Sequence, residues 1–144
     1  MEHVVRPYRP GDREALVELW SACELTRPWN DPYRDIERKL ARDPENLLVV
    51  EHDGNLVGSV MVGYEGHRGW VNYLAVNPCH RGQGLGRLLM ERAEEILRGL
   101  GAAKLNLQVR SSNEAALGFY ERLGYKQDEA VSMGKRLEAD RTGL

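Results

Sequence analysis

The sequence predicts an α/β (α+β) fold built on a mixed, mostly antiparallel sheet of about six to seven strands flanked by four helices. Two observations support this prediction. Strand-like and amphipathic helical segments are interleaved, and three strand-like segments follow one another in the middle of the chain. At 144 residues the chain has the length of one domain, so we expect residues 1–144 to form a single domain.

The first third of the chain predicts one strand and two helices. Residues 3–8 alternate loosely between apolar and polar, which is typical of a short strand. Asp12 is expected to cap a helix that runs to about Glu24, because apolar residues recur there at three- and four-residue spacing. Asp31, which a proline follows, is expected to cap a second helix that ends near residues 42–44.

The middle of the chain predicts three antiparallel strands and a long helix. Residues 47–51, 56–64 and 70–76 have strand character and are separated by short turns rich in glycine and polar residues. Residues 85–100 then place apolar side chains on one helical face. This helix is expected to end at the glycines at positions 99 and 101.

The last part of the chain predicts a strand, a helix and a weaker strand. Residues 104–110 alternate as a strand, and Ser111 with Glu114 matches a capping box that begins a helix ending at Gly124. Residues 125–137 have weak strand character. The strands before and after the long helix form a crossover unit, so we expect them to be parallel neighbours.

Composition narrows the classes of function. The chain is 42% hydrophobic and 29% charged with a formal net charge of −2, so it lacks the basic excess of a nucleic-acid-binding protein. It has no apolar run of membrane-spanning length and no secretory signal at its start, so we expect a cytoplasmic protein without a membrane partner. The two cysteines and four histidines lack metal-ligand spacing, so we expect reduced thiols and no metal.

A basic, glycine-rich turn before the long helix is the clearest candidate for a binding site. Backbone N–H groups at a helix start bind anions, and glycine lets a diphosphate approach them closely. A dinucleotide-binding turn would need Gly-x-Gly-x-x-Gly, but Arg87 stands where the third glycine belongs. We therefore expect a phosphate site formed by Arg81, Gly82, Gln83, Gly84, Leu85, Gly86 and Arg87.

Two motifs together resemble the GNAT superfamily of N-acetyltransferases. The first is Arg-x-x-Gly-x-Gly at residues 81–86, after a strand that ends in Leu-Ala-Val. The second runs from Leu107 to Tyr125, with the family's asparagine, alanine, tyrosine and Leu-Gly-aromatic ending. The resemblance covers essentially the whole chain, and it implies that the fourth and fifth strands splay apart around the pantetheine arm of acetyl-CoA. The chain looks most like the bacterial YpeA-type members, with motifs similar to those of RimI-type enzymes.

The resemblance implies roles for individual residues. Asn113 would hydrogen-bond the cofactor arm, and Tyr120 would protonate or hydrogen-bond the thiolate sulfur. From the residues alone, Asn113 also fits a helix cap, and Tyr120 also fits a packing side chain on an apolar helix face. Family members bind the phosphates through residues that match 82–87 here. They bind the acyl carbonyl and pantetheine through backbone groups that match Leu74, Ala75 and Val76.

The sequence does not identify a general base. RimI-type enzymes carry a glutamate where this chain has Gln108, and histone-type relatives carry one near the position of Trp70. An amide does not usefully accept a proton near neutral pH. The remaining candidates are a water chain or the side chains of Glu24, Asp31, Glu65 and His67.

Residues 26–33 lie where members of the family build the pocket for the acceptor. Trp29 is a candidate to stack on the acceptor and Asp31 to attract its ammonium group, with Asn30 between them. The alternative is that Trp29 packs under the loop and that Asp31 only caps the helix that follows.

The sequence therefore predicts an N-acetyltransferase that transfers the acetyl group of acetyl-CoA to a primary amine by direct attack in a ternary complex. The missing base leaves a second hypothesis, a non-catalytic acyl-CoA-binding or sensing module. A nucleotide-phosphate-binding domain is a third. The sequence does not identify the amine, and the resemblance allows a homodimer because many relatives dimerise.

Overall fold

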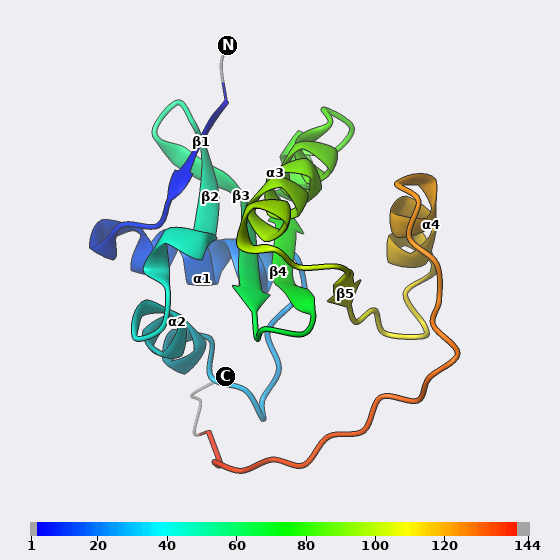
Figure 1. Cartoon of the computed structure of the whole chain (residues 1–144). Coiled ribbons are helices and arrows are strands. Elements are labelled where there is room, and N and C mark those ends of the chain that lie inside the picture. The colour runs from blue at the N-terminus through cyan, green and yellow to red at the C-terminus, as the bar shows by residue number, and fades with distance from the viewer. Residues whose placement is uncertain (1–2, 141–144) are drawn as a thin grey trace.

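The centre of the molecule is a five-stranded sheet in the order β1-β2-β3-β4-β5 (Figure 1). The computed structural model describes residues 3–140. Adjacent strands are antiparallel except β4 and β5, which are parallel, so the predicted mixed sheet and its crossover unit are confirmed. The strands are β1 (Val4–Pro7), β2 (Leu47–His52), β3 (Asn55–Tyr64), β4 (Gly69–Val76) and β5 (Leu105–Leu107).

Helices cover both faces of this sheet, with α3 in front and α1 behind in the view of Figure 1. As predicted, α3 connects β4 to β5. Within residues 3–140 no helix has the length and apolar character needed to cross a membrane. The helices are α1 (Arg13–Ala22), α2 (Pro32–Leu40), α3 (Leu85–Leu100) and α4 (Glu114–Arg122), with short 3-10 turns at Pro10–Asp12, Pro44–Asn46 and Pro78–His80.

The continuous apolar run in β2 supplies both faces of the core. Leu47 and Val49 pack with the buried residues of α1 and α2, whereas Leu48 and Val50 pack with those of α3. Successive strand residues point to opposite faces, so a strand covered on both sides is apolar at every position. Trp20 of α1 is completely buried in the first of these two clusters.

Two predicted caps are wrong in detail. The Asp12 carboxylate accepts the Arg9 N–H and pairs with the buried Arg6 guanidinium at 2.8 Å, so it closes a 3-10 turn and makes no side-chain cap of α1. At α4 the cap is Asn113, whose side chain accepts the Ala116 N–H, and Ser111 lies outside the helix. Asp31 caps α2 through the Tyr33 N–H, as predicted.

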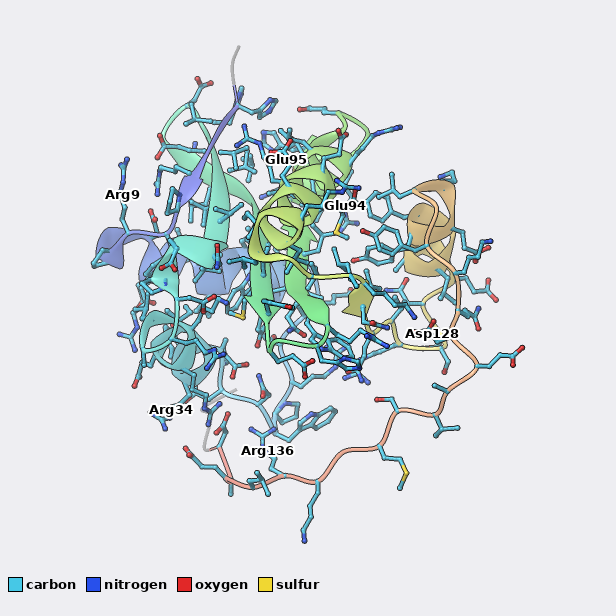
Figure 2. All side chains as sticks on the ribbon, viewed as in Figure 1. Arg9, Arg34, Glu94, Glu95, Asp128 and Arg136 are labelled. Carbon is cyan, nitrogen blue, oxygen red and sulfur yellow. The ribbon has the colours of Figure 1, made fainter. Side chains whose placement is uncertain are left out.

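The predicted count of six to seven strands is wrong, because the segment after Tyr125 forms no strand within the described residues. Its apolar side chains at Val131, Met133 and Leu137 are almost fully exposed. The neighbouring strand β5 is only three residues long, so it offers a short edge for pairing. Charge pairs instead hold the segment at α2, where Glu138 meets Arg34 and Asp140 meets Arg38. Figure 2 labels Arg34 of α2 and Arg136 of this segment, both in the lower part of the view.

Two glycines of β3 differ in how tightly their surroundings are packed. A Cβ on Gly58 would lie 3.1 Å from Val50 Cγ2 and 3.3 Å from the Ala75 carbonyl oxygen, whereas a Cβ on Gly63 meets only the Lys39 Nζ at 3.9 Å. We expect Gly58→Ala to lower the free energy of unfolding by about 1–3 kcal/mol through overpacking. Gly63→Ala should be neutral or stabilising by up to about 1 kcal/mol. Urea unfolding followed by circular dichroism measures both, and equal effects would contradict the packing described here.

Candidate active site

The glycine-rich turn needs glycine for its backbone conformation. Gly82 and Gly84 have φ values of +81° and +80°, a region that other residues rarely adopt, and no atom lies within 4 Å of a Cβ built on either. Gly86 is required for a different reason. A Cβ there would lie 3.0 Å from the Phe119 ring of α4, so this glycine lets α3 and α4 approach each other.

The turn ends at a helix start that favours an anion. The first intrahelical bond runs from the Leu88 N–H to the Gly84 carbonyl, so the N–H groups of residues 85–87 have no partner within the helix. The first turn of α3 contains no acidic residue, and the helix dipole places partial positive charge there. Arg81 and Arg87 add full charges on either side of these N–H groups. A helix start of this kind favours an anion, and the phosphate site at residues 81–87 stays a prediction.

β4 and β5 separate beside this turn. Their pairing covers only Gly69 to Val71 of β4, opposite Leu105 to Leu107, and β4 then continues to Val76 without β5. Where the two strands part, Tyr73 has a positive φ of +51° and the register between β3 and β4 shifts by one residue. An extra residue of this kind is a β-bulge, which leaves a backbone group outside the ladder. This bulge lies directly before Leu74, Ala75 and Val76, whose backbone groups the resemblance assigns to the acyl carbonyl and pantetheine.

Buried contacts to Tyr73 hold the bulge. The Tyr73 ring stacks on Trp20, with ring centroids 3.7 Å apart and an interplanar angle of 12°. The Ser59 hydroxyl accepts the Trp20 indole N–H at 2.9 Å and donates to the Tyr73 carbonyl at 2.8 Å. Ser59 is completely buried, so an unmade hydrogen bond here would be costly. Trp20 thus holds the Tyr73 ring directly and the Tyr73 carbonyl through Ser59.

The Tyr73 hydroxyl connects the bulge to α2 and to the segment before it. It donates to the Asp35 carboxylate at 2.7 Å, and the Asn30 amide donates to Asp35 and to the Tyr73 oxygen at 2.6 and 3.0 Å. Burial and then the Asp35 hydrogen bond raise the pKa of Tyr73 well above its usual value. Arg38 neutralises Asp35 at 2.9 Å. Sequence reasoning missed Tyr73 and Asp35, because nothing in strand or helix periodicity reveals a bulge.

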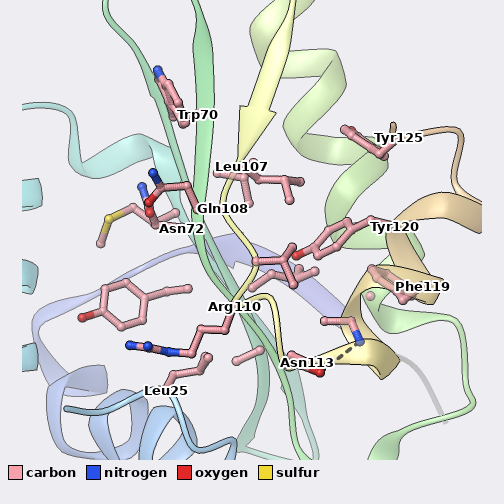
Figure 3. A pocket seen from close by; sticks show the side chains of 18 of the residues that line it. Leu25, Trp70, Asn72, Leu107, Gln108, Arg110, Asn113, Phe119, Tyr120 and Tyr125 are labelled. Carbon is pink, nitrogen blue, oxygen red and sulfur yellow. Dashed lines mark hydrogen bonds between the residues drawn. The ribbon is translucent and has the colours of Figure 1, made fainter. Parts of the chain in front are cut away.

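Tyr120 points toward the opening between β4 and β5 (Figure 3). Its ring meets Phe119 and Tyr125 edge to face, with centroids 5.0 and 5.9 Å away. Burial raises the pKa of the Tyr120 hydroxyl to about 12, and within residues 3–140 this hydroxyl makes no hydrogen bond. Tyr120 is half-buried and its hydroxyl oxygen is reached by solvent, so water can satisfy it. The packing and the catalytic interpretations of Tyr120 therefore both stay predictions.

Another wall of the same groove presents side chains from β4 and the segment after β5. Trp70, Asn72, Gln108 and Arg110 all line it, and Figure 3 shows Asn72, Gln108 and Arg110 pointing to one side. The two positions at which relatives place a base thus hold a neutral ring and a neutral amide. Gln108 donates to the Ser132 hydroxyl of the C-terminal segment.

Only some of the residues predicted for the acceptor site line the groove. Trp29, Asn30 and Glu65 line it, whereas Asp31 and His67 do not. Asp31 is occupied as the cap of α2, and His67 lies exposed in the turn between β3 and β4. Glu65 accepts the Arg68 N–H at 2.7 Å, so its carboxylate closes that turn.

The cysteines and histidines form no metal centre in the part of the chain that the structure describes. Cys23 and Cys79 are free thiols, and burial raises the pKa of Cys23, whose thiol donates to the Val76 carbonyl at 3.3 Å. The rings of His3, His52 and His80 gather near the glycine turn with neighbouring centroids 4.6 and 5.6 Å apart. Sequence spacing gave no sign of this cluster, because its members come from distant segments.

Comparisons with known proteins agree with this architecture. The model of a family described as the acetyltransferase (GNAT) family matches residues 13–125. An acetyltransferase of Pectobacterium atrosepticum is 49% identical over 137 residues, which are 95% of this chain and 97% of that protein. This chain therefore belongs to the GNAT family of acetyltransferases, and it is an acyltransferase.

Solved structures show the same fold. Ard1 from Thermoplasma volcanium superposes with a TM-score of 0.77 at 23% identity, over 86% of this chain and 82% of that one. The PaiA N-acetyltransferase from Thermoplasma acidophilum, solved in complex with coenzyme A, superposes with a TM-score of 0.80 at 18% identity, over 91% and 94% of the two chains.

The hydrogen bond from Tyr73 to Asp35 gives a test of the bulge. Tyr73→Phe keeps the ring on Trp20 but leaves the half-buried Asp35 carboxylate without one donor, so we expect the free energy of unfolding to fall by about 1–3 kcal/mol. The matched control is Tyr33→Phe, because the Tyr33 hydroxyl donates to Glu14 at an exposed site and its loss should change little. Denaturant unfolding of both variants provides the comparison. Equal stability of Tyr73→Phe and the wild type would show that this bond does not hold the bulge.

Proposed function

We propose that this protein transfers the acetyl group of acetyl-CoA to a primary amine by direct attack in a ternary complex. The observation that supports the proposal best is the opening between β4 and β5. One groove there joins a helix start suited to phosphate, a strand bulge and a tyrosine hydroxyl without a partner among the described residues. Acetyl-CoA would supply a thioester whose carbonyl carbon accepts the electron pair of the amine.

The start of α3 is the proposed place for the phosphates. The N–H groups of Leu85, Gly86 and Arg87 supply donors, and Gly82 and Gly84 leave open space in front of them. The side chains of Arg81, Gln83 and Arg87 complete the predicted set. Charge-assisted bonds from N–H donors to phosphate oxygens are stronger than bonds between neutral groups, which suits a highly charged cofactor.

The bulged part of β4 is the proposed place for the thioester. The amine attack puts negative charge on the carbonyl oxygen, and fixed N–H donors near that oxygen lower the barrier. The backbone of Leu74, Ala75 and Val76 follows the bulge at Tyr73, where β5 no longer occupies the edge of β4. Because the bulge is fixed by buried contacts, these donors need little reorganisation during the reaction.

Tyr120 is the proposed donor to the leaving sulfur. With a pKa of about 12 its hydroxyl stays protonated at neutral pH, so it can donate a hydrogen bond to a thiolate as the carbon–sulfur bond breaks. Asn113 uses its side-chain oxygen for the helix cap, which leaves its amide N–H groups to bind the cofactor arm. Both interpretations of Asn113 from the sequence are therefore compatible.

We propose that no side chain acts as a dedicated base. Gln108 and Trp70 occupy the two positions expected for one, Glu65 closes a turn, and Asp31 and His67 lie outside the groove. Glu24 lines the groove as an exposed carboxylate that no hydrogen bond within residues 3–140 orients. The acceptor would then react as the neutral amine that is already present in solution, or lose its proton to water in the open groove. An amine with a low pKa suits such a site best, because more of it is neutral at physiological pH.

The direct test is thiol release from acetyl-CoA with a panel of amines. We expect release to depend on one class of amine, and Tyr120→Phe to lower kcat by about 10²- to 10⁴-fold, the usual contribution of a positioned acid. Its matched control is Tyr33→Phe, which removes a hydroxyl far from the groove and should retain the wild-type kcat.

Two outcomes would contradict the proposal. An unchanged kcat in Tyr120→Phe would return this residue to a packing role. A wild-type protein that binds acetyl-CoA but releases no thiol with any amine would favour the second candidate function, a binding or sensing module. The neutral side chain at Gln108 is the observation that keeps this candidate in consideration.

A further inference from the structure

Arg110 is a cation in the groove without an anionic partner. It follows β5 by three residues, and its side chain extends toward Leu25 in Figure 3, on the side of the groove where Asn72 and Gln108 also point. Within residues 3–140 its guanidinium has no anionic partner and makes a cation–π contact with Trp29, whose ring centroid lies 5.8 Å from the guanidinium carbon. Trp29 is 55% exposed, so one face of this aromatic group remains open.

Four other cations that line this part of the groove are already paired, whereas Arg42, which follows α2, has no ion pair within residues 3–140. Arg38 binds Asp35 and Asp140, and Lys39 binds Asp43 at 2.7 Å. Lys104 binds Asp128, also at 2.7 Å, and Arg27 donates to the backbone carbonyls of Glu24 and Thr26. Arg110, beside Trp29, is therefore a cation of this wall able to accept an anion from outside the protein.

We propose that Arg110 binds a carboxylate that the acceptor carries close to its amine, and that Trp29 forms a flat wall against the rest of the acceptor. A guanidinium binds a carboxylate through two parallel N–H bonds, which fix its orientation as well as its position. The acceptors would be small primary amines with a carboxylate, such as free α-amino acids. This inference rests on the proposed acetyl transfer, since it assigns the acceptor of the same site.

The electrostatics of the wall disfavour acceptors with several positive charges. Asn72 and Gln108 are neutral, and the carboxylates of Asp35 and Asp43 are each held by a cation. A polyamine or a lysine-rich peptide would thus meet the positive charge of Arg110, which repels it. Glu24 is a carboxylate of the same groove that no cation holds within residues 3–140. The same guanidinium favours the neutral form of a nearby amine, which suits a site without a base.

Matched acceptors test the inference. Amino acids and their carboxamides, for example alanine and alaninamide, differ in the carboxylate that Arg110 would bind. We expect the wild type to prefer the carboxylate by about ten- to a hundredfold in kcat/KM, after correction for the neutral fraction of each amine. Arg110→Gln should remove most of this preference by raising the acceptor KM and should leave the KM for acetyl-CoA unchanged. Arg110→Lys should keep part of the preference, because a charge without the planar fork remains.

Arg92→Gln is the matched control, because it removes one positive charge from an exposed position on α3 outside the groove. It should keep the full preference for carboxylates. A wild type that favours the carboxamides, or an Arg110→Gln variant with an unchanged preference, would overturn the inference.

A binding measurement separates this inference from the proposed function. Titration calorimetry with N-acetylalanine and its amide, in the presence of coenzyme A, needs no turnover. Selective binding of the carboxylate that Arg110→Gln abolishes would support the inference even if no amine is acetylated, in which case only the proposed transfer would fail. Equal binding of both compounds by the wild type would exclude a carboxylate site at Arg110.

Discussion

The bulge at Tyr73 is the constraint on which the rest of the site depends. It lies where β4 loses its partner β5, so it sets both the width of the opening and the direction of the backbone groups that face it. Its contacts are local in space but distant in sequence: Trp20 from α1, Ser59 from β3 and Asp35 from α2. A positive φ at a bulky aromatic residue costs free energy, and a set of buried contacts is what keeps such a conformation populated.

The two ends of the groove, on either side of this bulge, draw their positive charge from different groups. At the α3 end, a helix start and the Arg81 and Arg87 side chains offer positive potential to phosphates. At the opposite end, paired charges leave Arg110 beside Trp29 as an accessible cation. Tyr120 lines the same groove, and its hydroxyl stays protonated at neutral pH because burial raises its pKa to about 12. The places proposed for phosphate, sulfur, acyl carbon and acceptor thus all belong to one continuous groove.

Much of the fold was predictable, because it depends on periodicity and on turn residues. The parallel crossover, the antiparallel strands, the cap at Asp31 and the helix that ends before Gly124 all follow from local pattern. The site was predictable only where a motif is continuous, as in residues 81–87. The roles of Tyr73 and Asp35, and the contact of Arg110 with Trp29, depend on distant segments that meet in the fold, which no local pattern reveals. The strand expected at residues 125–137 does not form, because strand character alone supplies no neighbouring strand to pair with. Glu138 and Asp140 bind α2 instead.

The central claim is that one site uses the backbone at the start of α3 and the backbone of β4 beside the opening, and backbone amide resonances report on it directly. On titration of the ¹⁵N-labelled protein with acetyl-CoA, the account predicts that the amides of residues 74–76 and of residues 82–87 shift together with one apparent Kd. The histidine cluster and the outer face of α2 should change little. Shifts confined to the glycine turn, with residues 74–76 unmoved, would contradict the account, because the thioester would then not lie beside the bulge.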